Sequence, residues 1–292
     1  LTTNIDFEQL GHYLGDPVVT TAIVFWPVLQ TAWMSLFDYS LLRPNERPFI
    51  GLGNFARAMG DEVFWISLWQ SVVWITACVA GQLLLGLVAG VLLNRSFWWR
   101  GVARALVIIP WALPSVIIAL MWSWMYDFNL GLINDLGLRL GLLAEPVAWL
   151  AQPRTAFWAI VLALIWQGFP FFAIVVLAGL QSIPKDLYEA AAADGASAWQ
   201  GFVRITLPSL MPVLMTALLR RTIWVANSLD VILVMTGGGP GYATHTLPLY
   251  AFVQAYSGLE FGYGSALALI LTVMLMGVVA LYIWRLQREQ DR

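Results

Sequence analysis

Six long apolar runs limit the fold of this chain more than any other feature. A helix needs about 20 mostly apolar residues to cross about 30 Å of hydrocarbon. Six segments meet that requirement: 17–37, 71–93, 102–126, 155–180, 207–235 and 263–284. We therefore expect an all-α polytopic membrane protein with six transmembrane helices and no sheet.

The composition agrees with this expectation. Of the 292 residues, 60% are hydrophobic and only 11% are charged, whereas a soluble domain carries about 25% charged residues. The chain therefore lacks the residues for a polar surface. The 16 tryptophans are typical of a protein with many residues at membrane–water interfaces.

The same counts exclude several kinds of site. The net charge is −2 and Lys185 is the only lysine, so no broad basic face for nucleic acid can form. Cys78 is the only cysteine, which excludes disulfides and thiolate metal sites. His12 and His245 lie far apart and belong to no metal-ligand motif. We expect no metal and no cofactor in this chain.

Basic residues in the short connections indicate the orientation. Lys and Arg concentrate on the cytoplasmic side of the membrane. The even connections and the C-terminal tail hold Arg95, Arg100, Arg104, Lys185, Arg204, Arg285, Arg288 and Arg292. Both termini are therefore expected in the cytoplasm, although Arg43, Arg47 and Arg57 in the first external loop count against this. Segment 1–16 shows no signal-peptide pattern, and because the sequence does not begin with Met, we expect a cytoplasmic stretch before it.

Helix breakers and small residues occur inside several spans. Pro110 and Pro114 are expected to interrupt the third span, and Gly168 and Pro170 the fourth. Such breaks are tolerated where the freed backbone groups face protein or a water-filled cavity; a kinked pathway lining and simple packing curvature both remain open. The segment 86–90 reads Gly-Leu-Val-Ala-Gly, a pattern that favours close helix packing.

The connection between the fourth and fifth spans, 181–208, predicts two short helices. Pro184 suits the first position of a helix, and the alanine run has high helix propensity. Gly195 can adopt the positive φ that ends a helix. A second, amphipathic stretch carries Trp199, Phe202 and Val203 on its apolar side. Small alanine side chains would let the first helix enter a groove on another protein.

At these residues the sequence resembles the permease subunits of binding-protein-dependent ABC importers. Their signature is Glu-Ala-Ala, Gly after three residues, and Ile-x-Leu-Pro nine residues later. The matching residues are Glu189, Ala190, Ala191, Gly195, Ile205, Leu207 and Pro208. The alternative, an alanine-rich surface helix, would have to produce these offsets by chance.

Further motifs are similar to the maltose- and trehalose-type first permease subunit. They are the segments 49–55, 221–224, 227–230 and 237–240. The resemblance covers nearly the whole chain after Pro17, and segment 1–16 does not fit it. It implies the type I importer permease fold over 17–292, with a cytoplasmic coupling loop at 181–208. It also implies a bacterial or archaeal cytoplasmic membrane, a second permease, two copies of an ABC ATPase and an extracytoplasmic solute-binding protein.

The chain itself is expected not to be an enzyme. A phosphate-binding loop needs Gly-Lys-Ser/Thr, and the only lysine, Lys185, follows Pro184. ATP and Mg²⁺ would therefore bind to the partner ATPase. The residues expected to couple to that ATPase are Glu189, Ala190, Ala191, Asp194, Gly195, Ile205, Leu207 and Pro208.

Two consecutive arginines are expected near the middle of the membrane. Arg220 and Arg221 lie about 18–20 Å along the fifth helix from Pro208, where each costs roughly 2.5–3.5 kcal/mol on insertion scales. Trp224 and Asn227 share their helical faces. An arginine, an indole and an amide suit a hydroxylated solute, so the expected substrate-binding residues are Arg220, Arg221, Trp224, Asn227 and Asp230. An internal salt bridge or carbonyl caps would be the structural alternative, and Asp230 could instead pair with a partner subunit.

The favoured substrate is a disaccharide such as trehalose or maltose; glycerol phosphate, a polyol and an oligosaccharide remain open. An ion-coupled secondary transporter would need an isolated intramembrane acid and inverted repeats, and only Asp230 meets the first condition. A membrane-embedded enzyme would need a nucleophile–base pair or a metal set, for which no motif is present.

Overall fold

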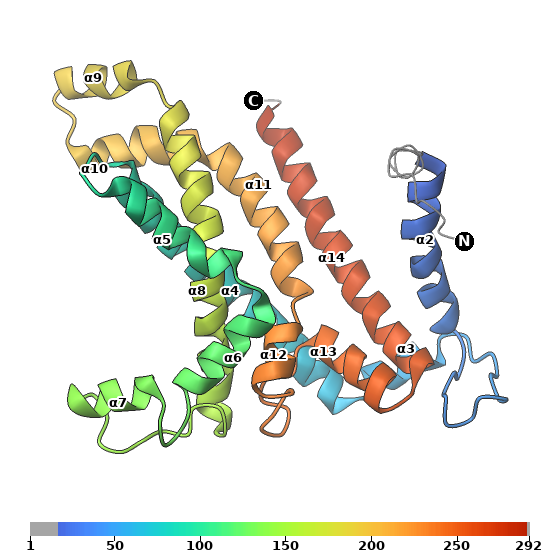
Figure 1. The fold of residues 1–292 in the computed structure, drawn as a ribbon. Coiled ribbons are helices and arrows are strands. Elements are labelled where there is room, and N and C mark those ends of the chain that lie inside the picture. The colour runs from blue at the N-terminus through green and yellow to red at the C-terminus, as the bar shows by residue number, and fades with distance from the viewer. Residues whose placement is uncertain (1–16, 291–292) are drawn as a thin grey trace, which may run out of the picture. The chain divides into compact units, whose positions relative to one another are not determined.

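The computed structural model describes residues 17–290, and every regular element in this range is helical (Figure 1). The N-terminal segment 1–16 and Arg292 lie outside the described residues. Two isolated antiparallel bridges, Phe37–Phe49 and Ser40–Glu260, are the only β pairing in the described part. The predicted all-α fold is confirmed.

Most of the predicted spans are present as long helices. Among the residues that the structure describes, four stretches are long and apolar enough to cross a membrane. They are α4 (Glu62–Asn94), α8 (Pro153–Ser182), the stretch Ala198–Met235, and Phe261–Trp284 of α14 (Phe261–Gln290). The pair α5 (Arg100–Ala112) and α6 (Ser115–Met125), bent by 97°, forms a fifth crossing if counted as one span. The first predicted run contains α2 (Pro17–Met34), several of whose side chains are outside the described set.

The remaining helices either connect these spans or form part of the stretch Ala198–Met235. They are α3 (Gly53–Met59), α7 (Leu132–Arg139), α9 (Lys185–Ala193), α10 (Ala198–Gly201), the π-helix η1 (Phe202–Thr206), α11 (Leu207–Ala226), α12 (Asp230–Met235), α13 (Leu247–Phe252) and the π-helix η2 (Val253–Ser257). The stretch Ala198–Met235 thus consists of α10, η1, α11 and α12, with a break at 227–229.

The proline-containing spans behave differently from one another. The chain is extended at Leu113, where ψ is 140°, and α6 begins directly after Pro114. A residue before proline is pushed out of the helical region, so Pro114 explains the 97° bend. The expected interruption at Pro110 is wrong, because α5 continues through this residue. The predicted interruption of the fourth span is wrong, because α8 continues through Gly168 and Pro170. A helix tolerates an internal proline when neighbouring structure satisfies the freed backbone group.

Two compact units divide the chain. One contains residues up to Trp65 together with Tyr250–Val278, and the other contains Ile66–Leu249 and the C-terminal residues. In the second unit, α8 packs against α5, α6, α11 and α12, and α6 packs against α12. Figure 1 shows α9 and α7 near opposite ends of α8. This unit carries the residues with expected functions.

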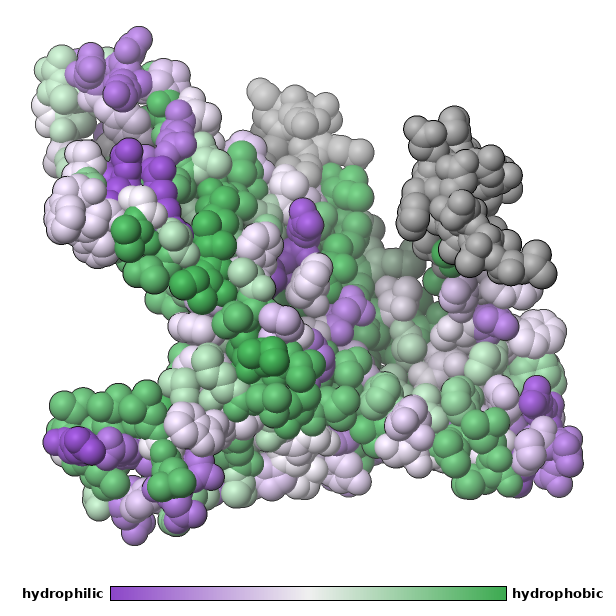
Figure 2. All heavy atoms as spheres, viewed as in Figure 1, coloured by the Kyte–Doolittle hydropathy of each residue, from purple (hydrophilic) through white to green (hydrophobic). Residues whose placement is uncertain are grey.

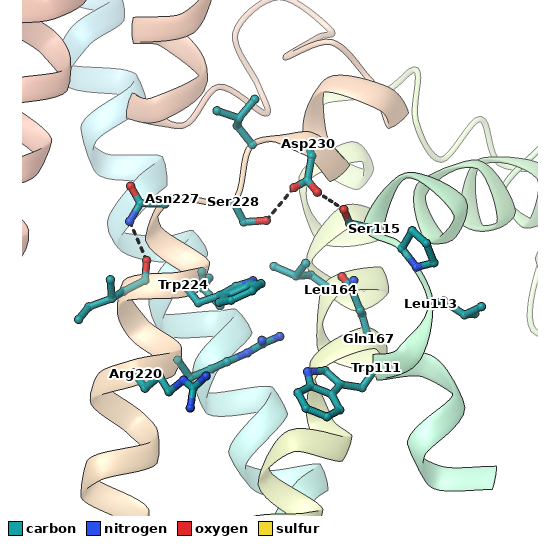
Figure 3. Close-up of a pocket in the computed structure, with 15 residues that line it drawn as sticks. Trp111, Leu113, Ser115, Leu164, Gln167, Arg220, Trp224, Asn227, Ser228 and Asp230 are labelled. Atoms are coloured by element: carbon teal, nitrogen blue, oxygen red, sulfur yellow. Dashed lines mark hydrogen bonds between the residues drawn. The ribbon is translucent and has the colours of Figure 1, made fainter. Parts of the chain in front are cut away.

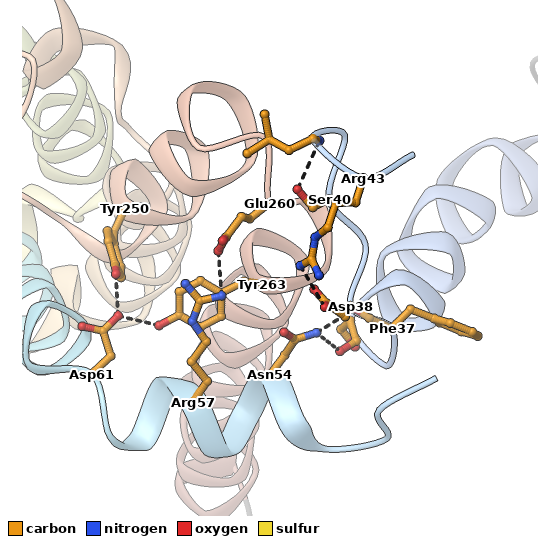
Figure 4. Close-up of polar contacts among 12 residues, drawn as sticks. Phe37, Asp38, Ser40, Arg43, Asn54, Arg57, Asp61, Tyr250, Glu260 and Tyr263 are labelled. Atoms are coloured by element: carbon orange, nitrogen blue, oxygen red, sulfur yellow. Dashed lines mark hydrogen bonds and ion pairs between the residues drawn. The ribbon is translucent and has the colours of Figure 1, made fainter. Parts of the chain in front are cut away.

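Polar contacts hold the first unit together (Figure 4). The Asp61 carboxylate accepts hydrogen bonds from the hydroxyls of Tyr250 and Tyr263, the latter at 2.6 Å. Burial opposes ionisation of Asp61, but these bonds and two backbone amides outweigh it and hold its pKa below the usual value. Arg57 pairs with Glu260 at 2.6 Å and lies over the Tyr263 ring. The segments before α4 and around the start of α14 are thereby joined.

Close packing of α4 against α8 depends on glycine, as the sequence predicts. A Cβ on Gly86 would lie 2.9 Å from the carbonyl oxygen of Phe169 and closer still to the Cβ of Phe172. A Cβ on Gly90 would lie 2.6 Å from Val176 Cγ1. Small residues let two helices approach closely where lipid supplies no hydrophobic drive for association.

We predict that Gly86→Ala lowers the thermal stability of the purified protein. The added methyl group meets backbone atoms that cannot move aside, and overpacking of this kind costs about 1–3 kcal/mol. Gly277→Ala is the matched control, because a Cβ on this glycine of α14 has no atom within 4 Å. Equal melting temperatures for the two variants would contradict the assigned packing of α4 on α8.

Candidate functional site

All five residues expected to bind the solute line one cavity of about 770 Å³ in the second unit. The walls come from the last turns of α11, the link to α12, the break between α5 and α6, and α8 (Figure 3). The lining residues are Trp111, Leu113, Pro114, Ser115, Leu164, Gln167, Arg220, Arg221, Ile223, Trp224, Val225, Asn227, Ser228, Leu229 and Asp230.

The end of α11 supplies one wall. Arg220 and Trp224 are one turn apart and exposed, with 65% of Trp224 accessible. Asn227 caps the helix, and its side-chain nitrogen donates to the carbonyl of Ile223 at 2.8 Å. The bond anchors the amide beside the cavity. A cation, an indole and an amide are thus presented on the same side of the pocket.

The facing wall contains residues that sequence reasoning missed. Trp111 lies in the last turn of α5, and Figure 3 shows it across the cavity from Trp224. Trp111 lies there because the chain bends at Pro114. The sequence predicted an interruption at this proline but not the direction of the bend. Gln167 projects from α8; an isolated amide in an otherwise apolar run was the signal that could have identified it.

Asp230 stands at the start of α12 and forms its hydrogen bonds within this chain. Its carboxylate accepts hydrogen bonds from Ser115, at the start of α6, and from Ser228 at 3.1 Å. Both serines line the cavity. The two bonds link the breaks in the α5–α6 and α11–α12 stretches, so the acid lines the cavity and also joins its two walls.

The two arginines lie in different environments. Arg220 is exposed, whereas Arg221 is 7% exposed. The Arg221 Nε donates to Gln82 Oε1 of α4 at 2.6 Å, and the Gln82 Nε2 donates to the Leu164 carbonyl of α8 at 2.9 Å. A Cβ on Gly168 would collide with the side chains of both Arg221 and Gln82. We call Gln82, Gly168 and Arg221 the amide–guanidinium junction; it ties α4, α8 and α11 together.

This junction contains no acidic partner. None of the three ion pairs found among the described residues includes Arg221. A hydrogen bond to a charged group is worth about 1.5–3 kcal/mol, and the nearby cavity supplies a polar surface. The guanidinium is therefore compensated by a neutral amide, and not by the salt bridge considered as one alternative.

The segment 181–208 has the predicted form of helix, turn and helix. Pro184 precedes α9, so the helix begins one residue later than expected. Gly195 has φ +81°, and the amide of Ala196 donates to the Ala191 carbonyl at 2.9 Å, which closes the end of α9. A capping box formed by Ser197 and Gln200 starts α10.

The first of these helices, α9, is exposed. No residue of α9 is buried, and Glu189 and Asp194 are exposed. The Tyr188 hydroxyl meets Thr206 Oγ1 at 2.9 Å, which holds α9 against the end of η1. The second helix continues into α11, because α10, η1 and α11 follow one another without a gap. The contact between Tyr188 and Thr206 thus joins α9 to the continuous stretch that contains α11.

We predict that Gln82→Leu strongly reduces the amount of folded protein or assembled complex. The substitution leaves a buried guanidinium without its partner, and an unsatisfied buried donor costs about 1–3 kcal/mol, or more when it is charged. Arg220→Gln, at an exposed position, should leave the yield unchanged. The measurement is the intact fraction on size-exclusion chromatography. A normal yield for Gln82→Leu with a depleted yield for Arg220→Gln would reverse the roles assigned to the two arginines.

Comparisons with known proteins agree with these features. A family model described as "binding-protein-dependent transport system inner membrane component" matches residues 82–288. The trehalose/maltose transport system permease protein MalF of Thermococcus litoralis is 42% identical, over 97% of this chain and 96% of its own. The sulfoquinovosyl glycerol transport system permease protein SmoG of Agrobacterium fabrum is 39% identical, over 94% and 88%.

The fold has a solved counterpart. A bacterial ABC transporter involved in the import of the acidic polysaccharide alginate superposes with a TM-score of 0.83, covering 96% of both chains at 21% identity. The fold is thus that of an ABC importer permease. The chain belongs to the family described as the binding-protein-dependent transport system inner membrane component, as a permease subunit.

Proposed function

We propose that this chain and a second permease together form the path by which a disaccharide, trehalose or maltose, enters a bacterial or archaeal cell. An extracytoplasmic solute-binding protein would deliver the sugar, and two copies of an ABC ATPase would bind ATP and Mg²⁺ and drive transport. Both termini of this subunit would lie in the cytoplasm. The observation that carries the proposal is the cavity lined by Arg220, Trp224, Asn227 and Asp230.

The chemistry of the cavity suits a neutral sugar. Its volume of about 770 Å³ falls within the range of about 300–1,000 Å³ typical of small-molecule pockets. Trp111 and Trp224 offer flat apolar surfaces for sugar rings. Arg220, Asn227 and Gln167 provide hydrogen-bonding groups at the wall. The two relatives named above are sugar-related permeases by their descriptions, which supports a sugar as the solute.

The cavity carries charges of both signs. It holds Asp230 as well as Arg220 and Arg221, and Arg221 is already hydrogen-bonded to Gln82. An anionic solute would be attracted by Arg220 and repelled by Asp230. A solute with hydroxyl groups and no net charge, such as a sugar, can use both the donors and the acceptors.

The energy for transport would enter through the coupling loop, 181–208, of the permease domain, 17–292. The exposed α9 would dock on the ATPase through Glu189, Ala190, Ala191 and Asp194, with Gly195 shaping the turn. Ile205, Leu207 and Pro208 mark the passage into the span. Since α10, η1 and α11 are contiguous, movement of the docked helix would be passed to the wall that carries Trp224.

We predict that Trp224→Ala and Asn227→Ala raise the sugar concentration needed for half-maximal uptake while leaving assembly intact. Loss of one stacking or hydrogen-bonding contact worth about 1.4 kcal/mol changes affinity tenfold. Trp158→Ala is the matched control, because this exposed tryptophan of α8 does not line the cavity. Uptake by proteoliposomes, with trehalose and maltose compared, is the measurement. Unchanged concentration dependence and unchanged preference between sugars in both cavity variants would refute the solute site.

We predict that Gly195→Ala uncouples transport from ATP hydrolysis without blocking insertion. A β-carbon there meets no atom within 4 Å, yet φ is +81°, a conformation that costs an L-residue about 1–2 kcal/mol. Gly201→Ala is the matched control in the same loop, with φ −59° and equally open space. ATP hydrolysis and sugar uptake are measured on the same complex. A normal ratio of uptake to hydrolysis in Gly195→Ala would remove the coupling role of this turn.

A further inference from the structure

The connection between α6 and α8 carries an unusual concentration of exposed apolar side chains. It runs from Asp127 to Gln152 and contains the short helix α7. The exposed apolar residues along it are Phe128, Leu130, Leu132, Leu136, Leu138, Leu140 and Leu142. Patches of this kind on a protein surface mark contact with another apolar phase.

The side chains of α7 lie on three faces of the helix, which differ in polarity and burial. Leu132, Leu136 and Leu140 follow one another at four-residue spacing and form one exposed stripe, because such positions lie on the same side of a helix. Beside it, Arg139 Nε meets Asp135 Oδ1 at 2.8 Å in an exposed ion pair. The remaining face carries Asn134 and Gly137, which are buried. We call the first of these faces the leucine stripe.

The leucine stripe is held in a fixed position by Asn134. Its side-chain nitrogen donates to the carbonyls of Asp127, Phe128 and Val147, at 3.2, 3.3 and 3.0 Å. Its side-chain oxygen accepts from the amide of Val147 at 3.1 Å and from the indole of Trp149 at 2.9 Å. One buried amide therefore closes the whole connection around α7. The leucine stripe therefore belongs to a helix that specific hydrogen bonds hold in place.

The position of α8 places this connection at one surface of the membrane. Because α8 has 30 residues, it is about 45 Å long, similar to the 40–45 Å of a bilayer with its headgroups. The connection joins the Pro153 end of α8, and α9 follows the Ser182 end. Trp124, near the end of α6 beside it, is exposed, and exposed tryptophans favour the membrane interface.

The apolar surface of the neighbouring helices continues toward α7. Trp124 on α6, and Trp158 and Leu162 on α8, are exposed large apolar residues, and α6 contacts α7 directly. In Figure 2, hydrophobic atoms cover the upper edge of the lower-left lobe that α7 forms, and hydrophilic patches lie on its left and lower sides. The apolar side thus faces the depth at which hydrocarbon begins, and the ion pair lies beside it.

We propose that α7 is an interfacial helix that lies in the lipid headgroup region, with the leucine stripe inserted toward the acyl chains. Short amphipathic helices of this kind bury their apolar face about 5–10 Å into the boundary between headgroups and acyl chains. The Asp135–Arg139 pair then stays among the headgroups. This contact would anchor the α6–α8 connection, and with it the bent pair α5–α6 that forms one wall of the cavity. The proposal does not depend on which solute is carried.

The test uses a fluorescent label on single cysteines in the assembled transporter, reconstituted into phosphatidylcholine vesicles. The buried Cys78 is first replaced by alanine, and Leu136→Cys and Leu140→Cys place the label on the stripe. Asp135→Cys is the matched control on the charged face, where an exposed ion pair contributes little stability. Phosphatidylcholine brominated high on its acyl chains should quench both stripe labels strongly and the control weakly. Aqueous iodide should give the opposite order.

Three results would overturn the proposal. Iodide quenching of the stripe labels as strong as that of the control would place the leucine stripe in water. Protection of the stripe labels from both quenchers would mean that a protein, such as the second permease, covers it. Loss of lipid quenching when the solute-binding protein is added would identify the stripe as that protein's docking surface.

Discussion

A charged group buried between three helices sets the arrangement of the transport unit. Arg221 has no carboxylate partner in the described structure and depends on Gln82, which is itself hydrogen-bonded to the backbone of α8. Inside a membrane such a group persists only if protein or water compensates its lost hydration. The need to keep this contact holds α4, α8 and α11 in register. It also fixes the face of α11 that remains open to the cavity, where Arg220 and Trp224 are exposed.

The cavity exists because two membrane-crossing stretches are broken at corresponding places. Pro114 separates α5 from α6, and the segment 227–229 separates α11 from α12. Irregular backbone is tolerated at membrane depth only where it is buried in protein or lines a polar cavity. Ser115, Ser228 and Asp230 lie at these breaks and hydrogen-bond across them. The breaks thus provide the polar groups of the pocket while remaining joined to each other.

Much of this architecture could be predicted from sequence, because apolar run length and helix-ending residues are local signals. The spans, the α9 turn at Gly195 and the five cavity residues near the end of α11 are of this kind. Contacts between distant segments could not be predicted. Gln82 lies 139 residues before Arg221, and nothing in the apolar run around it indicates which helix it meets. For the same reason, the positions of Trp111 and Gln167 in the cavity wall could not be predicted from sequence.

Local rules also misled where tertiary structure overrides them. Pro170 was expected to interrupt its span, but α8 is continuous, whereas Pro114 bends the chain by 97°. The difference lies in the surroundings of each proline, since Pro170 is buried in the helix that most of the second unit packs against. The leucines of α7 fall between the predicted spans 102–126 and 155–180, where the length of the apolar run alone predicts no membrane contact.

The central claim is that the bond between Arg221 and Gln82 is structural. It is tested most directly by replacing both partners at once, with Gln82→Leu and Arg221→Met in one chain, and measuring the yield of intact complex. Replacing both members of a buried polar pair by apolar groups of similar shape is often nearly neutral, whereas removing one partner is costly. The account predicts that the double variant assembles far better than Gln82→Leu alone. A double variant as depleted as Gln82→Leu alone would contradict it.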